Sequence, residues 1–310
     1  MSTPRPTSSR SSRRVADRVP PVRARARTRV ERSWAERVRA NREQVDRVRE
    51  VPDGRDFYAP VTSLFRADPR RTDEPVLDLL RALVEPGETW LDIGAGAGRY
   101  ALPIALLARD VIALDPSTGM LGALRDQMAE FDVPNVRPIQ GRWPPDATLA
   151  EALGAFPVAD VALIAHVGYD VEAIGPFVDA MEDAARRLCV AVLMERQPAS
   201  VADPFWPPIH GEARVALPAL PDFVELLRER GREPEVTVVR REPRTFETRN
   251  ELEGFLRRQL WIADGGDKER RYRAALEELV VERRGGFGLR DQEPMPVGVA
   301  AWRPRTAARE

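Results

Sequence analysis

An aspartate and three glycines form a spaced pattern that can hold a ligand against the backbone. The pattern begins at Asp92 and places glycines at positions 94, 96 and 98. Residues 89–93 before it read as a short buried strand, and apolar residues resume from position 100 as a helix. Glycine tolerates the positive φ of a tight strand-to-helix turn, and without a Cβ it lets a ligand approach the backbone closely. The residues therefore predict a ligand site at the end of a buried strand.

The spacing of the glycines indicates which of two kinds of cofactor the loop would bind. A dinucleotide fingerprint that starts at Gly94 needs its third glycine at position 99, where this chain has Arg99. The pattern D-x-G-x-G-x-G instead resembles motif I of the class I S-adenosylmethionine-dependent methyltransferases. The resemblance implies S-adenosyl-L-methionine as the cofactor, with its methionine end wrapped by Asp92, Gly94, Ala95, Gly96 and Gly98.

A second acidic residue ends the next predicted strand. Residues 110–114 lead into Asp115, whose carboxylate can accept hydrogen bonds from both hydroxyls of a ribose. The residues that follow resemble the D-x-S-x-x-M-L segment of the same family, in which the methionine packs on the adenine face. The resemblance therefore places Asp115, Pro116 and Met120 at the cofactor.

The loop after the third predicted strand differs from the family pattern at one position. Many relatives have an acid that meets the adenine amino group at the position where this chain has Arg142. Backbone groups of Gly141, Arg142 and Trp143 remain candidates for contact with adenine, and the Trp143 side chain is a candidate to cover it. The alternative interpretation of these residues is an apolar plug in a surface loop.

Three residues are candidates for catalysis. His166 and Tyr169 follow the fourth predicted strand, whose end lies beside the glycine loop in this fold, and His210 lies in a proline-rich stretch at 198–221. Each is a candidate base if the methyl acceptor is a hydroxyl or a carbon acid. Packing of His166 against the cofactor is an equal alternative, because the methyl donor is already activated and alignment alone can suffice. Neither an Asn-Pro-Pro-Tyr tetrad nor a Pro-Cys pair is present, which argues against methylation of DNA adenine or of a pyrimidine ring.

The elements that must position these residues alternate between strand and helix. This alternation predicts an α/β fold, a three-layer Rossmann-like sandwich with a mostly parallel sheet and ligands at the carboxyl ends of its strands. The resemblance implies seven strands in the order 3-2-1-4-5-7-6, the last antiparallel, with N-terminal helices. Strands are expected at 89–93, 110–114, 136–140, 160–165, 189–194, 235–241 and 297–302, and late helices at 221–230, 248–260 and 267–283.

The domain organisation is predicted from composition. Residues 1–30 are expected to form a disordered basic arm and residues 31–70 an N-terminal helical segment, which includes an aromatic stretch at 57–65. Residues 71–305 are expected to form the methyltransferase domain, with an insertion at about 198–221 that suits a lid or substrate loop.

Composition limits the function classes. One cysteine and two histidines exclude a disulfide framework or a cysteine-based zinc site, and no metal is expected. No apolar run is long enough to span a bilayer and no apolar signal region is present, so no membrane partner and a cytoplasmic location are expected. A single lysine, Lys268, against many arginines is typical of a bacterial protein from a GC-rich genome.

The charge is unevenly distributed, which keeps two classes of substrate open. Residues 1–50 contain 15 arginines and 6 acidic residues, whereas the whole chain has a net charge of −1. The acidic remainder and the aromatic insertion favour a small-molecule acceptor. The basic arm keeps RNA as an alternative substrate. Two further hypotheses are an NAD(P)-dependent oxidoreductase and a non-catalytic protein that binds the cofactor.

Overall fold

A mostly parallel seven-stranded sheet forms the centre of the molecule. The computed structural model describes residues 26–52, 66–240, 242–243 and 245–305. The strands lie in the order β3-β2-β1-β4-β5-β9-β6, and β9 runs antiparallel to both of its neighbours. Because β7 and β8 form a separate hairpin, β9 is the seventh strand of this sheet in chain order, and the predicted strand order is confirmed. The sheet strands are β1 (Thr89–Ile93), β2 (Asp110–Asp115), β3 (Val136–Gln140), β4 (Ala159–Ala165), β5 (Ala185–Met194), β6 (Glu235–Val239) and β9 (Val297–Trp302).

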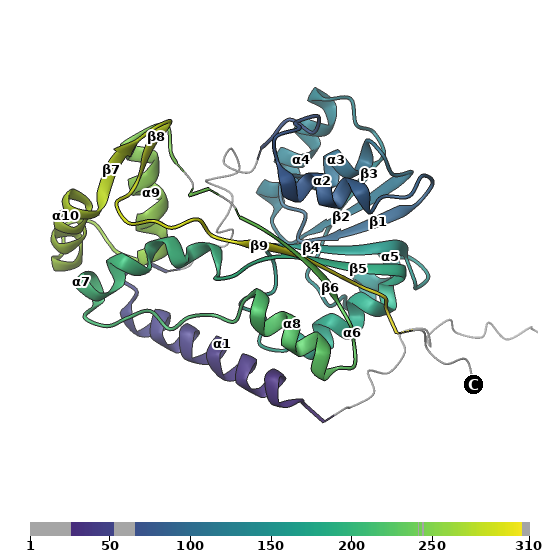
Figure 1. The fold of residues 1–310 in the computed structure, drawn as a ribbon, viewed down its shortest axis with the longest axis horizontal. Helices are drawn as coiled ribbons and strands as arrows, with labels where there is room; N and C mark the ends of the chain where they lie inside the picture. The colour runs from purple at the N-terminus through teal and green to yellow at the C-terminus, as the bar shows by residue number, and fades with distance from the viewer. Residues whose placement is uncertain (1–25, 53–65, 241, 244, 306–310) are drawn as a thin grey trace, which may run out of the picture.

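Helices cover both faces of the sheet (Figure 1). One face packs against α2 (Pro75–Ala82), α3 (Ala101–Ala105) and α4 (Thr118–Glu130) through a continuous apolar cluster. The other face packs against α5 (Ala147–Leu153), α6 (Ile174–Ala184) and α8 (Leu220–Glu229). All five residues of β1 are buried, as expected for a strand covered on both faces. The three-layer sandwich is therefore confirmed.

The N-terminal helix α1 (Arg29–Val48) forms an outer layer on α6 and α8. Thr28 and Glu31 close a capping box at its start, which explains why the helix begins just before the predicted boundary. Trp34 is 2% exposed and donates its indole N–H to the Val171 carbonyl at 3.0 Å. The helix is thus an integral part of the core, although residues 1–25 and the aromatic stretch at 57–65 lie outside the described residues.

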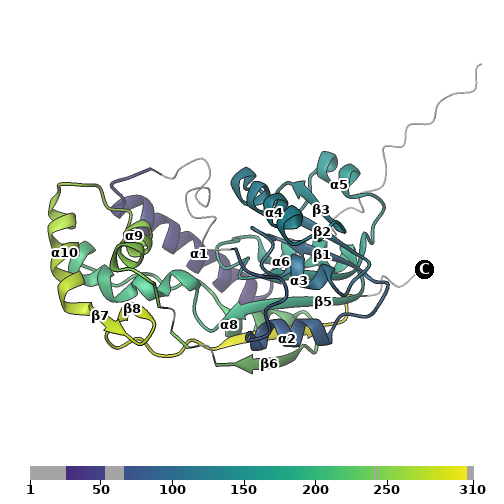
Figure 2. The same cartoon turned by 90° about the horizontal axis from the view of Figure 1, so that it is seen from above.

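A second core lies beyond the carboxyl ends of the strands and is called here the helical lobe (Figure 2). The predicted helix at 267–283 is wrong in its last four residues, because β-branched Val280 and Val281 begin a strand that turns at Arg284 and Gly285. The insertion at 198–221 contains two short helices that pack in this lobe. The lobe consists of η2 (Pro198–Phe205), α7 (Trp206–His210), α9 (Arg249–Leu260), α10 (Asp267–Leu279), β7 (Val280–Arg283) and β8 (Gly286–Leu289).

Candidate functional site

The glycine loop leaves β1 and turns under the end of β2. The backbone N–H groups of Gly94 and Ala95 both donate to the Leu114 carbonyl, at 2.7 and 3.0 Å. Gly94 has φ +79°, and a Cβ there would lie 2.4 Å from Cγ2 of Val167. A side chain at position 94 would therefore be strained and would collide with the loop that follows β4. Glycine is required here by both the backbone and the close packing.

Asp115 is fixed by the glycine loop itself. One carboxylate oxygen accepts the Gly96 N–H and the other accepts the Ser117 N–H, each at 2.8 Å. Because each oxygen of an ionised carboxylate has two lone pairs, such a group can bind two backbone donors and two hydroxyls together. The carboxylate is therefore held in one orientation at the end of β2, as the assignment of Asp115 to the ribose requires.

Asp92 lies beneath the same loop and is 2% exposed. Its Oδ1 is buried and has no hydrogen-bond partner among the described residues. Burial, together with the nearby charge of Asp115, raises the pKa of the Asp92 carboxyl to about 7. Two acidic side chains close together at the carboxyl ends of the adjacent strands β1 and β2 favour a ligand with positive charge.

The start of α4 completes the predicted cofactor site. Ser117 caps this helix by accepting the Met120 N–H at 3.0 Å, and Pro116 is exposed. Met120 is 3% exposed in a small apolar cluster with Ala97 and Ala123, separate from the two main cores. Gly98 packs tightly against the same helix, since a Cβ there would lie 2.4 Å from Leu124. The helix that carries Met120 is thus locked to the glycine loop.

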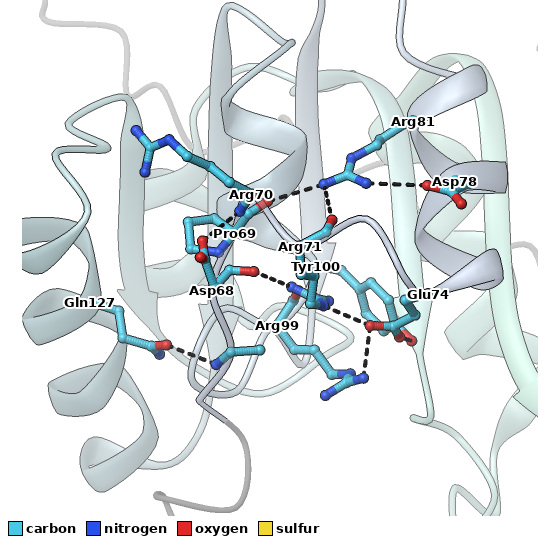
Figure 3. A network of polar contacts seen from close by, with 11 residues as sticks. Asp68, Pro69, Arg70, Arg71, Glu74, Asp78, Arg81, Arg99, Tyr100 and Gln127 are labelled. Carbon is cyan, nitrogen blue, oxygen red and sulfur yellow. Dashed lines mark hydrogen bonds and ion pairs between the residues drawn. The ribbon is translucent and has the colours of Figure 1, made fainter. Parts of the chain in front are cut away.

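Figure 3 shows a network that anchors the far side of the glycine loop and that local sequence patterns do not reveal. Glu74, at the start of α2, accepts hydrogen bonds from Arg71 at 2.7 Å, Arg99 at 2.8 Å and the Tyr100 hydroxyl at 3.1 Å. Arg71 also donates to the Arg99 carbonyl at 2.9 Å. Burial opposes ionisation of Glu74, but Arg99 and Arg71 outweigh it and hold the pKa of Glu74 below its usual value.

The loop after β3 lies beside Asp115 but is tied to the protein. The Gly141 N–H donates to the Asp115 carbonyl at 3.1 Å, and a Cβ on Gly141 would lie 2.6 Å from Leu149. Trp143 donates its indole N–H to the Phe177 carbonyl at 3.1 Å and packs on the core beside α6. Arg142 is exposed. These contacts favour an anchoring role for Trp143 over a free cover on adenine.

His166 and Tyr169 lie together after β4. His166 has φ +58°, uncommon for a residue with a side chain, and its backbone N–H donates to the Val192 carbonyl at 2.8 Å. Its ring centroid lies 6.4 Å from that of Tyr100. The Tyr169 hydroxyl accepts the Met194 N–H at 2.7 Å, and burial raises the pKa of Tyr169. This contact and the raised pKa favour an anchoring role for Tyr169 rather than that of a base.

The third catalytic candidate, His210, belongs to the helical lobe. It ends α7, which packs against α10, and its ring centroid lies 4.7 Å from that of Trp206. Burial, aided by the charge of Lys268, lowers the pKa of His210 to about 4. Figure 1 shows α7 on the far side of the lobe from the carboxyl ends of β1 and β4. The structure does not bring His210 to the glycine loop.

Solved structures share this fold. The YcgJ protein of Bacillus subtilis matches with a TM-score of 0.50 at 14% identity, over 74% of this chain and 98% of the other. A candidate methyltransferase from Bacillus halodurans matches with a TM-score of 0.52 at 15% identity, over 75% and 99% of the two chains. At these identities the likeness is one of fold, and it agrees with the fold expected from the glycine motif. No protein-family model matches the chain.

Two curated proteins share part of the sequence. Ribosomal RNA small subunit methyltransferase G of Deinococcus radiodurans is 32% identical over 146 residues, which are 41% of this chain and 55% of that protein. An uncharacterized protein of Haemophilus influenzae is 32% identical over 112 residues, 36% of this chain and 37% of that protein. The chain thus spans about half the length, or less, of the curated relatives it matches. Among the described residues, no helix is long and apolar enough to cross a membrane.

Proposed function

We propose, from the class I methyltransferase fold of this chain, that it is an S-adenosylmethionine-dependent methyltransferase acting on a small-molecule acceptor by in-line displacement. The observation that carries the proposal is the coupling of the two predicted acidic residues to one glycine turn. Asp115 accepts the Gly96 N–H at 2.8 Å, and Asp92 lies buried beneath the turn with an unsatisfied Oδ1. These residues fit a nucleoside that carries a positive charge near its other end.

The residues divide between the two ends of the cofactor. Asp115 would accept the ribose hydroxyls, and Met120, beside Ala97, would pack on the adenine. The backbone of Gly94 to Gly98 would surround the methionine end, and Asp92 would face its positive charge. Gly141 would contribute backbone contacts near the adenine.

The protein itself has to contribute little to the chemical step. When bound, S-adenosylmethionine supplies a methyl group activated by a positively charged sulfur. The chain must align the acceptor with this group and exclude water, which can lower a barrier by roughly 7–11 kcal/mol in favourable cases. His166 lies after β4, next to Tyr100 and the glycine loop, and is the candidate to take a proton from a hydroxyl acceptor.

RNA is the second candidate substrate, and the similarity to the Deinococcus enzyme favours it. Five of the six arginines of α1 add little to this support, because they contact carboxylates within the chain. Arg37 contacts Asp222 at 2.6 Å and Arg47 contacts Glu212 at 2.8 Å. Arg39 and Arg42 both contact Glu172, at 3.3 and 3.4 Å. Residues 1–25 contain seven further arginines and one acidic residue, and are the segment on which the RNA alternative depends.

A transfer assay tests the proposal. The full chain is incubated with S-adenosylmethionine labelled in its methyl group, and either a small-molecule extract or total RNA is offered as acceptor. We expect label in the small-molecule fraction, abolished by Asp115→Ala. Label in RNA alone would replace the first candidate by the second. Binding of the cofactor without transfer to either fraction would support a non-catalytic protein.

A further inference from the structure

The turn that follows β4, residues 166–169, begins with a strained backbone and is called here the His166 turn. His166 has φ +58°. Among the described residues, only two others that carry a side chain have a positive φ, and both lie at helix ends. Asp132 follows the C-cap of α4 and Trp261 is the C-cap of α9, where a left-handed residue is common. His166 instead ends a buried parallel strand, and strain at such a place persists only because surrounding contacts hold it.

The hydrogen bonds of β5 show how the His166 turn leaves the sheet. The His166 N–H donates to the Val192 carbonyl at 2.8 Å, which closes the pairing of β4 with β5. In a regular parallel ladder the next bond would run from the Met194 N–H to the His166 carbonyl. Met194 instead donates to the Tyr169 hydroxyl at 2.7 Å. The Tyr169 hydroxyl thus takes the place of the His166 carbonyl, and the backbone turns away from β5 at His166.

The His166 turn is packed against the glycine loop. A Cβ on Gly94 would lie 2.4 Å from Cγ2 of Val167, so the two segments meet with no space for a side chain. The centroid of the His166 ring lies 6.4 Å from that of Tyr100, which follows the glycine loop. Tyr100 is held in turn by Glu74, which accepts its hydroxyl at 3.1 Å. These contacts place the imidazole beside the glycine loop.

Tyr169 is placed to keep the turn in this conformation. It is 6% exposed and packs in the core cluster that α6 and α8 share with the sheet, so its hydroxyl is held at the end of β5. Burial raises the pKa of Tyr169, and the hydroxyl therefore remains a neutral acceptor for the Met194 N–H. Without this hydroxyl, the Met194 N–H would take the His166 carbonyl as its acceptor. His166 would then relax toward a regular strand conformation.

We propose that Tyr169 is a positioning residue of the methyl-transfer site that acts through His166, because its hydroxyl keeps His166 in the left-handed conformation that holds the imidazole at the glycine loop. This inference rests on the proposed function, in which His166 takes a proton from a hydroxyl acceptor. Removing the Tyr169 hydroxyl therefore displaces the imidazole and leaves the contacts that hold the cofactor in place.

Nuclear magnetic resonance of the full chain with ring-labelled histidine tests the inference, because His166 and His210 are its only histidines. His166→Gln assigns the two sets of signals. In the ligand-free chain, Tyr169→Phe should move the His166 signals and leave those of His210 in place. Tyr272→Phe is the matched control, since it removes another buried hydroxyl, which donates to the Glu253 carbonyl at 2.6 Å. It should leave the His166 signals unchanged.

Stability and turnover give two further readouts. Each variant loses one hydroxyl hydrogen bond to a backbone group, so the two should lower the midpoint of urea unfolding to a similar extent. Only Tyr169→Phe should lower the transfer rate at saturating S-adenosylmethionine, by roughly ten- to a hundredfold, because only this variant misplaces the imidazole. The KM for S-adenosylmethionine should change little in either variant.

The outcomes separate this inference from the proposed function. Unmoved His166 signals in Tyr169→Phe, or equal movement in Tyr272→Phe, overturn the positioning role even if the unmutated chain binds S-adenosylmethionine and transfers its methyl group. Absence of S-adenosylmethionine binding by the unmutated chain overturns the proposed function, and the positioning role in methyl transfer with it, whether or not the His166 signals move.

Discussion

At the residue scale, Asp92 couples the candidate cofactor site to pH. Its pKa is raised by burial and by Asp115 from an ordinary 3.8 to about 7 in the folded protein. Between these two values the folded chain holds a proton that the unfolded chain has released. The contribution of Asp92 to stability is therefore greatest at low pH and is lost as the pH rises toward 7.

Binding of a positively charged cofactor should lower the raised pKa of Asp92. A cation near Asp92 favours the ionised carboxylate, so binding should release a proton. We predict that the affinity for S-adenosylmethionine rises from about pH 5.5 to pH 7, by up to about tenfold per pH unit, and levels off above pH 7. Calorimetry in buffers of different ionisation enthalpy measures the released proton. Asp92→Asn should show no such release, and a flat pH profile in the unmutated chain would contradict this role.

Glu74 is the residue on which the anchoring network depends. Its side chain is 15% exposed and is shared by two guanidinium groups and the Tyr100 hydroxyl. Glu74→Gln should lower the free energy of unfolding by about 1–3 kcal/mol and weaken cofactor binding, because Arg99 and the glycine loop lose their charged partner. Urea unfolding and cofactor titration measure the two effects. Glu151→Gln, at an exposed position of α5, is the matched control, and equal behaviour of the two variants would argue against the anchoring role.

At the element scale, a buried ion pair joins α6 to the loop between α8 and β6. Glu182 accepts from Nε of Arg232 at 2.7 Å and from the Trp302 indole at 3.0 Å, and both charged side chains are less than 10% exposed. Glu182→Ala leaves the Arg232 charge buried and should cost about 3–5 kcal/mol in urea unfolding. Glu225→Ala removes a surface partner of Arg29 and should cost about 0–1 kcal/mol. Similar losses in the two variants would show that the buried pair is not what holds α6.

The elements that can be predicted well from the sequence are those whose signal is local. The strands β1, β2 and β4 are short apolar runs bounded by glycine, proline or acidic residues, and their burial on two faces makes them easy to recognise in the sequence. The hairpin β7–β8 is not predicted, because Val280 and Val281 continue the apolar spacing of α10. The helix α5 is not predicted either, although Asp146 caps it by accepting the Leu149 N–H at 2.8 Å.

In the candidate site too, the residues with a local sequence signal can be predicted and the others cannot. The glycines, Asp92 and Asp115 stand close together in the sequence, and their spacing alone indicates a nucleoside site. The roles of Glu74 and Arg71 cannot be predicted from local patterns, because their partners at the glycine loop lie more than 20 residues away in the sequence. The Arg99–Glu74 contact, for example, has a sequence separation of 25.

At the scale of the whole molecule, the chain combines a sheet domain with the helical lobe, and α1 packs along the sheet domain. Deleting residues 1–25 leaves α1 intact, whereas a cut at residue 50 would remove buried Trp34. We predict that the shorter deletion leaves cofactor affinity and small-molecule turnover unchanged. An RNA enzyme that uses the arm would instead lose RNA affinity, with a weaker dependence on salt. Filter binding at several salt concentrations distinguishes the two.

The most direct test of the central claim is calorimetric titration of the full chain with S-adenosylmethionine, S-adenosylhomocysteine and NAD. Asp115→Ala removes the carboxylate at the carboxyl end of β2, and Asp110→Ala, at the exposed start of the same strand, is the matched control. We expect micromolar binding of the first two ligands, lost in Asp115→Ala and retained in Asp110→Ala. Preference for NAD, or no binding of any of the three, would contradict the account and leave a Rossmann-like fold with another function.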